Sequence, residues 1–392
     1  MTKRFTAVFL LTLIAGLLYA WLAPSYTYEK TSSLLDAHKY IRLYHFFQGE
    51  PTNPSVPFPY NTRILMPWLA AHLPEPDMKT AFLFLTVLFS AVCTGTMAVV
   101  WEKLGIRPAV WIPALCWMVL HWKGILRMYQ PDPANADSPL YAFQALWMLV
   151  WLGEPDKIRR LTAFSLLAVL GTLTKEAMLL LTVFYWLWQW REEKRIWNGA
   201  VIPMLLAAGT RIAAGLAFPP EGADWRSSSF ITPFRVIWYY LKNAGLMARI
   251  PVSWFVAYGG FLAAGIQLWR SAYRETPRRQ KWIFWGAGLW VLLSLVGGGD
   301  TSRIFFNGAP FVLTALLLGI NTIRAPWFSS VLLFTSVPLM RLNEAEPDPA
   351  FLPAWDHRWC VECWTLTESL PYAGYAVVLF VLLALWLRHR AF

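Results

Sequence analysis

Charged side chains are scarce in this sequence, and their scarcity is the first constraint on its fold. Asp, Glu, Lys and Arg make up 15% of the 392 residues, and hydrophobic residues make up 57%. A soluble domain carries charge at roughly a quarter of its positions. The shortage excludes a separate soluble domain of ordinary composition, so the chain is expected to be a polytopic membrane protein.

Cysteine and histidine are also rare. Four cysteines are too few for a disulfide framework, and Cys93 and Cys116 lie in apolar runs where they are expected to pack. Cys360 and Cys363 form WCVEC in a polar connector, and no second pair completes a zinc site. A loop disulfide and two free thiols remain alternatives for this pair. The six histidines show no ligand spacing, so we expect no cofactor and find no support for a divalent metal.

The sequence does contain a series of apolar blocks long enough for helices in a bilayer. A helix needs about 20 residues to cross the hydrocarbon core, so the blocks predict an all-α bundle of about 11–12 membrane helices in a single domain, residues 1–392. Half-helices that enter and return would also fit the region 161–190. The candidate crossings are 6–23, 79–101, 109–126, 138–153, 161–174, 176–190, 198–217, 248–269, 282–298, 304–320, 326–340 and 371–387.

Basic residues gather in every second connector, and this pattern predicts the orientation. The most basic of these connectors is RSAYRETPRRQK, residues 270–281. The positive-inside rule places such connectors in the cytoplasm together with both termini. The first apolar run lacks a convincing cleavage site and is expected to be a retained helix. The predicted location is the inner (plasma) membrane. Basic cytoplasmic connectors account for the net charge of +11, so no nucleic-acid partner is expected. The longer outward connectors are 24–78, 121–137, 218–247 and 341–370.

The first outward connector begins as an interfacial amphipathic helix. Residues 30–48 carry apolar and aromatic side chains at helical spacing, with Asp36 and Tyr40 four positions apart and therefore on one side. A proline-rich stretch follows and leads to Arg63, just before a second apolar segment. A cap or a solvated position on this helix would be the ordinary interpretation of Asp36. Residues 218–247 could form another interfacial helix.

Three further outward connectors carry charge next to apolar runs. Asp137 precedes Ser-Pro and is equally well interpreted as a helix N-cap. Lys175 and Glu176 lie between two apolar runs with almost no loop, where charges are costly and mark sites or ion pairs. Neighbouring residues cannot pair across a helix face, so each needs a distant partner. Asp300 and Arg303 follow three glycines, and a plain N-cap is again the alternative.

This mixture of charges suits group transfer from a lipid that bears a phosphate. Arg63, Lys175 and Arg303 could grip the phosphate, since guanidinium and ammonium groups bind its oxygens. A carboxylate could take the proton of the attacking hydroxyl, and partial burial would strengthen each interaction. Asp36 would then lie near the lipid because one substrate is itself a lipid.

Four segments, in this order, resemble the GT-C superfamily of polytopic glycosyltransferases, which use polyprenyl-phosphate sugars. LLDAHKY matches the place of the catalytic Asp in the first outer loop of that family. The others, PYNTRILMPWLA, LTKEAMLLL and DTSRIFFNGAP, resemble blocks of an uncharacterised bacterial group. The resemblance implies inverting transfer of a hexosyl or pentosyl group from a polyprenyl-phosphate donor to a glycan or lipid acceptor outside the cytoplasm.

The resemblance also implies residue roles. It makes Asp36 the base that activates the acceptor hydroxyl, and it assigns the leaving lipid phosphate to Arg63, Lys175 and Arg303. Asp137 and Glu176 would orient the sugar or the acceptor, and Tyr40 and Asp300 complete the predicted substrate-binding set. Ala37 follows Asp36 where many relatives carry a second acid, which argues against a carboxylate dyad. A WWD-type motif is missing, so peptide glycosylation is not expected.

Other functions fit parts of the pattern. A transporter or flippase for a lipid-linked or anionic solute would also bind phosphate, but it predicts charges near mid-membrane and matching halves. A polymerase or ligase of the O-antigen type would carry large Arg-rich outer loops, which this sequence lacks. A purely structural membrane protein explains the helices but not the charges beside them.

Overall fold

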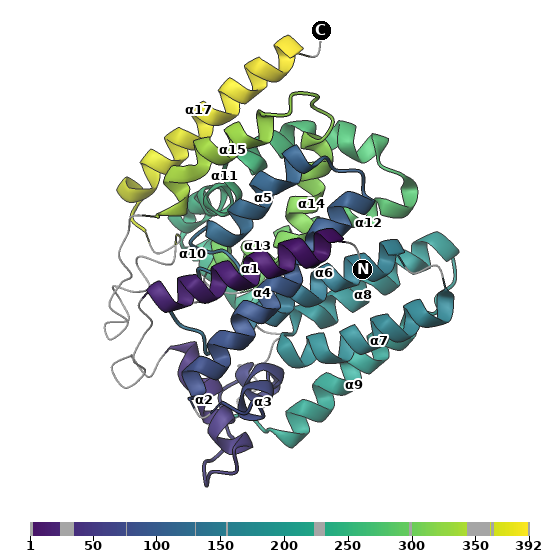
Figure 1. Cartoon of the computed structure of the whole chain (residues 1–392), viewed down its shortest axis with the longest axis vertical. Helices are drawn as coiled ribbons and strands as arrows, with labels where there is room; N and C mark the ends of the chain where they lie inside the picture. The colour runs from purple at the N-terminus through teal and green to yellow at the C-terminus, as the bar shows by residue number, and fades with distance from the viewer. Residues whose placement is uncertain are drawn as a thin grey trace. The chain divides into compact units, whose positions relative to one another are not determined.

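The computed structural model of the chain describes residues 3–23, 35–75, 77–129, 131–153, 156–222, 232–297, 300–342, 361 and 364–390. These residues form helices and turns and contain no strand, which confirms the all-α expectation for this part of the chain (Figure 1). Cys360 and Cys363 lie outside the described residues. The chain divides into two compact units, residues 1–103 with 128–229 (unit 1) and 104–127 with 230–392 (unit 2).

Among the described residues, four helices are long and apolar enough to cross a membrane, which agrees with a membrane protein of several spans. The larger count of 11–12 spans stays a prediction, because the other apolar helices are shorter. The four long helices are α1 (Lys3–Leu22), α4 (Met78–Lys103), α11 (Ala244–Glu275) and α17 (Leu366–Arg390). The shorter ones include α5 (Pro108–Leu120), α9 (Val201–Ala217), α14 (Ala309–Ile320) and α15 (Phe328–Ser336).

Unit 1 packs its long helices side by side, and residues 35–75 pack at one end of them. Helix α1 lies along α4, α4 along α6, and α7 along α9 (Figure 1). The aromatic face of α2 is buried there against α3 and the start of α4, through Tyr40, Tyr44, Met66 and Phe82. The remaining elements are α2 (Asp36–Phe47), η2 (Tyr60–Thr62), α3 (Leu65–Ala71), α6 (Asp137–Gly153), α7 (Lys157–Thr174) and α8 (Ala177–Glu193).

Short connectors join packed neighbours in unit 1, so successive helices run in alternate directions and the connectors fall at two opposite ends. Asp137, Lys175 and Glu176 lie at one end. At the other, the end of α6 lies beside Lys103, and Arg4 pairs with Glu102 at 2.9 Å. The basic connectors after α6 and α8 are also at that second end. The orientation of these two ends in a membrane stays a prediction.

The turn between α7 and α8 is only two residues long. Lys175 has extended backbone angles, φ −160° and ψ 140°, and its N–H closes the last turn of α7 on Gly171. The predicted crossings at 161–174 and 176–190 are therefore two separate helices of 18 and 17 residues.

In unit 2, three predicted crossings are shorter than expected or divided, and a fourth, 248–269, is interrupted at Gly259 within α11. The segment 304–320 is broken into α13 (Thr301–Phe306) and α14 because Asn307, Gly308 and Pro310 interrupt it. The segment 109–126 ends early, since His121 leaves α5 with extended angles, φ −62° and ψ 143°. The segment 326–340 ends as a 3-10 turn after α15, where Pro338 follows. The unit also contains α10 (Thr232–Lys242), η4 (Arg278–Gln280), α12 (Trp282–Val296) and η5 (Val337–Met340).

Candidate functional site

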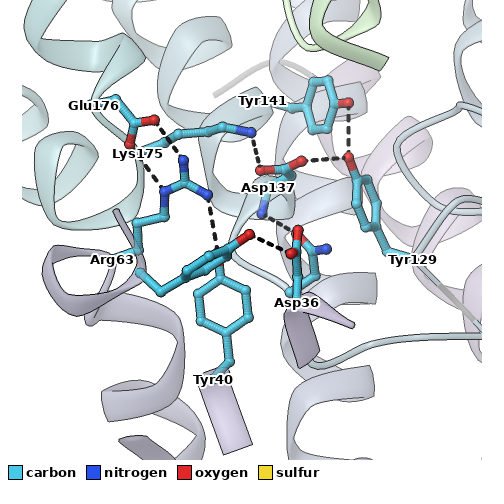
Figure 2. A network of polar contacts seen from close by, with 10 residues as sticks. Asp36, Tyr40, Arg63, Tyr129, Asp137, Tyr141, Lys175 and Glu176 are labelled. Atoms are coloured by element: carbon cyan, nitrogen blue, oxygen red, sulfur yellow. Dashed lines mark hydrogen bonds and ion pairs between the residues drawn. The ribbon is translucent and has the colours of Figure 1, made fainter. Parts of the chain in front are cut away.

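Six of the eight residues predicted from the sequence lie together at one end of unit 1 (Figure 2). The centre of this network is the pair of neighbours Lys175 and Glu176. Successive side chains on extended backbone point to opposite sides, so the extended conformation of Lys175 sends the two charges apart. Each finds a partner in a different part of the chain, as their adjacency predicts. The other four members are Asp36, Tyr40, Arg63 and Asp137.

The first ion pair joins Glu176 to Arg63. The guanidinium donates from Nη2 to Oε1 at 2.5 Å and from Nε to Oε2 at 3.0 Å, a two-point contact that a lysine could not make. Arg63 is 8% exposed, while the Glu176 side chain is 29% exposed. The 3-10 turn η2 ends directly before Arg63 and aims it at α8.

The second ion pair joins Lys175 to Asp137 at the start of α6. Lys175 Nζ lies 2.5 Å from Asp137 Oδ1, and the hydroxyl of Tyr129 donates to the other carboxylate oxygen at 3.0 Å. Tyr129 and Tyr141 place their hydroxyl oxygens 3.4 Å apart, and the Asp137 N–H donates to Asn135 at 2.9 Å. Asp137 is only 1% exposed, so it lies deep within these partners rather than at a solvated cap.

Asp36, the predicted base, is half-buried at the start of α2. The Tyr60 hydroxyl donates a hydrogen bond to its Oδ1. The Tyr60 ring also lies 5.3 Å from the Arg63 guanidinium and packs edge-on against Tyr40 at 5.6 Å. Tyr40 in turn accepts a hydrogen bond from Arg63 Nη1 at 3.3 Å. Two tyrosines therefore connect the carboxylate of Asp36 to the ion pairs.

The environment keeps the ion pair charged and both phenols protonated. Burial works against the charge of Glu176, but the Arg63 guanidinium outweighs it and lowers the Glu176 pKa to about 2. Burial also opposes the charge of Arg63, and Glu176 outweighs it there, so the Arg63 pKa is raised. Burial raises the pKa of Tyr60 and of Tyr40, and the Asp36 carboxylate raises both further.

Asp300 and Arg303, the other two predicted residues, belong to unit 2. Asp300 is the N-cap of α13, where its carboxylate accepts from the Arg303 N–H at 2.9 Å, as the alternative interpretation expected. The same carboxylate forms an ion pair with Lys123, whose Nζ lies 2.6 Å from Asp300 Oδ2. Lys123 is fully buried. This cluster stabilises unit 2 at the start of α13. Substrate contact by either residue stays a prediction.

Sequence reasoning missed Arg211, which lies on α9. Both terminal guanidinium nitrogens are buried and have no hydrogen-bond partner within the described ranges. The Phe58 ring lies 5.2 Å from the guanidinium, and Arg63 and Glu176 are close enough to act on its charge. A signal was present, since Arg211 is the one charged residue of an apolar helix, VIPMLLAAGTRIAAGLA. Tyr60 and Tyr129 carried no such signal.

No three His, Cys, Asp or Glu side chains of the described residues are grouped closely enough to hold a metal ion. The arrangement can instead present a carboxylate and several cations to one ligand. Searches of protein-family models, of curated proteins and of solved structures find no match to this chain.

Proposed function

We propose that the chain is an integral-membrane glycosyltransferase that moves a sugar from a polyprenyl-phosphate donor to an extracytoplasmic acceptor with inversion. The carrying observation is the position of Asp36, a half-buried carboxylate that the ring and hydroxyl of Tyr60 connect to the Arg63 guanidinium. The resemblance of four sequence segments to the GT-C superfamily supports the same reaction. The apolar helices support a lipid substrate.

In the proposed reaction Asp36 acts on the acceptor. The acceptor oxygen loses its proton to the carboxylate and forms a bond to the anomeric carbon. The bond from that carbon to the donor phosphate oxygen breaks, and its electron pair leaves with the polyprenyl phosphate. Attack opposite the leaving group inverts the anomeric carbon. Tyr60 would orient the Asp36 carboxylate through the hydrogen bond that it donates.

The leaving phosphate needs cations, and unit 1 offers them in two forms. Arg63 and Lys175 are already paired with carboxylates. They therefore contribute a fixed polar environment rather than direct binding of the phosphate. Arg211 has two buried terminal nitrogens that lack an acceptor among the described residues, and a phosphate oxygen would satisfy them. We therefore assign the direct phosphate contact to Arg211. Arg63 and Lys175 act as positioning residues, because their ion pairs hold the site together.

The proposal is tested by offering the purified full chain a panel of hexosyl and pentosyl polyprenyl phosphates and a membrane lipid extract. Mass spectrometry follows loss of donor and gain of glycosylated product. Asp36→Asn should lower turnover by about a hundredfold to ten-thousandfold while donor binding remains. Asp77→Asn is the matched control, since Asp77 is an exposed N-cap of α4 and Asn caps equally well. Wild-type turnover in Asp36→Asn would refute the assignment of the base.

A transporter or flippase is the second candidate, and one feature of unit 2 favours it. Helix α11 is broken at Gly259, with φ 52° and ψ −134°, and broken spans are common in transporters. The Gly260 N–H donates to Ser336 Oγ at 2.7 Å, so packing also explains the break. In sealed vesicles a flippase would move a labelled polyprenyl-phosphate sugar between leaflets without changing its mass, whereas the transferase would change the mass.

A further inference from the structure

A groove between the last turns of α11 and the first turns of α12 has the features of a lipid site. We propose that it binds the headgroup and one acyl chain of an anionic phospholipid. Its volume is about 440 Å³. Aromatic and cationic side chains form its walls, namely Trp269, Arg270, Tyr273, Arg274, Phe284 and Trp285.

The aromatic part of the groove is closely packed. Phe284 is 3% exposed, and its ring meets the rings of Trp269 and Tyr273 edge-on at 4.9 Å and 5.5 Å. Trp285 is 45% exposed at the groove wall. Gly288 also lines the groove, and open space surrounds the position where a Cβ on it would stand. The rings therefore form a preformed apolar surface beside open space.

Cations line the other part of the groove. Arg270 and Arg274 are exposed and lie four residues apart on one face of α11. Within the described residues, no ion pair joins either of them to a carboxylate. Lys281 Nζ lies 4.6 Å from the centre of the Tyr273 ring and adds a third charge. Two guanidinium groups at this spacing fit the oxygens of a phosphodiester.

Each of the two helices also carries an exposed apolar side chain beyond the groove residues. Ile266 is 51% exposed one turn before Arg270, and Leu292 is 61% exposed one turn after Gly288. Helical spacing puts Ile266 on the face of Arg270 and Leu292 on the face of Trp285. Both apolar residues lie farther than the arginines from the connector 276–281. A headgroup at the arginines would therefore direct its acyl chain along Ile266 and Leu292, which a soluble phosphate would leave uncovered.

The place of the groove in the chain supports a lipid as well. Helix α11 is one of the four candidate membrane spans, and the groove lies where it enters the basic connector 276–281. Trp and Tyr concentrate at the membrane–water boundary, and basic pockets between spans bind anionic headgroups. The sequence predicts this connector on the cytoplasmic side. The site uses residues of unit 2 alone, and the proposed transfer reaction is not needed for it.

Native mass spectrometry of the full-length chain tests the proposal directly. The chain is reconstituted with phosphatidylcholine and phosphatidylglycerol, and the lipid retained after exchange into detergent is counted. We expect retention of phosphatidylglycerol, and we expect Arg270→Gln with Arg274→Gln to weaken it about tenfold or more. Arg278→Gln with Arg279→Gln removes the same charge from the adjacent turn and should change retention much less. Both arginines of the groove are exposed, so folding should survive; circular dichroism checks this.

Three results would overturn the proposal. The first is equal retention of the two lipids by the wild type. The second is equal loss in the two double variants, which would mean general attraction of basic residues to an anionic surface. The third is displacement of phosphatidylglycerol by an equal concentration of glycerol 3-phosphate, which would make the ligand a soluble phosphate. Trp285→Leu keeps every charge, and reduced retention in this variant would support the contribution of the ring.

Discussion

Arg63 and Glu176 are 113 residues apart in the sequence and are joined by two charge-assisted hydrogen bonds, of 3.0 and 2.5 Å. This contact attaches the first connector of unit 1 to the start of α8. Because Lys175 is the neighbour of Glu176 and binds Asp137, the same turn also holds the start of α6. One two-residue turn therefore organises three parts of the candidate site.

Replacing Arg63 by lysine should destabilise the protein although the charge remains. A lysine cannot form both hydrogen bonds to Glu176, so we expect a loss of about 1–3 kcal/mol in the free energy of unfolding. Arg42→Lys is the control, because the Arg42–Glu221 pair is exposed and should change stability by about 1 kcal/mol or less. Thermal unfolding in detergent measures both, and equal shifts would show that the two-point contact is not special.

The Arg63–Glu176 pair should make stability depend on pH in the acidic range only. The Glu176 pKa is lowered from 4.5 to about 2, so its stabilising effect is complete above pH 4.5. The effect is lost as the pH falls from 4.5 towards 2, because the unfolded chain binds the proton first. The stability difference between the wild type and Glu176→Gln should be constant at neutral pH and shrink over that interval. A difference that grows on acidification would contradict the pairing.

Lys175 and Asp137 should be coupled in a double-mutant cycle. Lys175→Met leaves a carboxylate that is 1% exposed without its ammonium partner, and a loss of about 3–5 kcal/mol is expected. Asp137→Asn leaves Lys175 partly buried and should also destabilise. The double variant should cost less than the sum, with a coupling of about 0.5–3 kcal/mol. Additive losses would show that the two residues act independently.

Arg211→Met should have opposite effects on stability and on ligand binding. It removes two buried nitrogens that have no acceptor in the described part of the chain, so the ligand-free protein should gain about 1 kcal/mol or more in stability. If the proposed phosphate contact is right, binding of polyprenyl-phosphate donors should fall in the same variant. Unfolding and donor binding are measured on one preparation. A less stable variant with unchanged binding would make Arg211 a structural residue.

Tyr60→Phe should affect the rate of the proposed reaction more than binding. The substitution keeps the ring between Arg63 and Tyr40 but removes the hydrogen bond to Asp36. A less well oriented base should lower kcat by about tenfold to a hundredfold with little change in KM. Tyr44→Phe is the matched control on the same side of unit 1, because Tyr44 belongs to the α2–α3 core. A change in KM alone would assign Tyr60 to substrate binding.

Several features of the site follow from local sequence. The helix at Asp36, the turn before Arg63 and the break between α7 and α8 are encoded by helical spacing, proline and the two charges themselves. The need of Lys175 and Glu176 for distant partners also follows from their adjacency. Breaks inside apolar segments are harder to predict from the sequence. The segment 304–320 was wrongly expected to be one helix, because its high hydropathy outweighed the signals of Asn-Gly and Pro.

The sequence by itself determined that the chain is helical and rich in membrane-length apolar segments, and it marked most of the charged residues of the site. These properties depend on composition and on the spacing of near neighbours. Only the tertiary structure decided that Arg63 meets Glu176, that Lys175 meets Asp137, and that Arg211 remains without an acceptor among the described residues. Such pairings join residues far apart in the chain, and the packing of the helices selects among several possible partners for each charge.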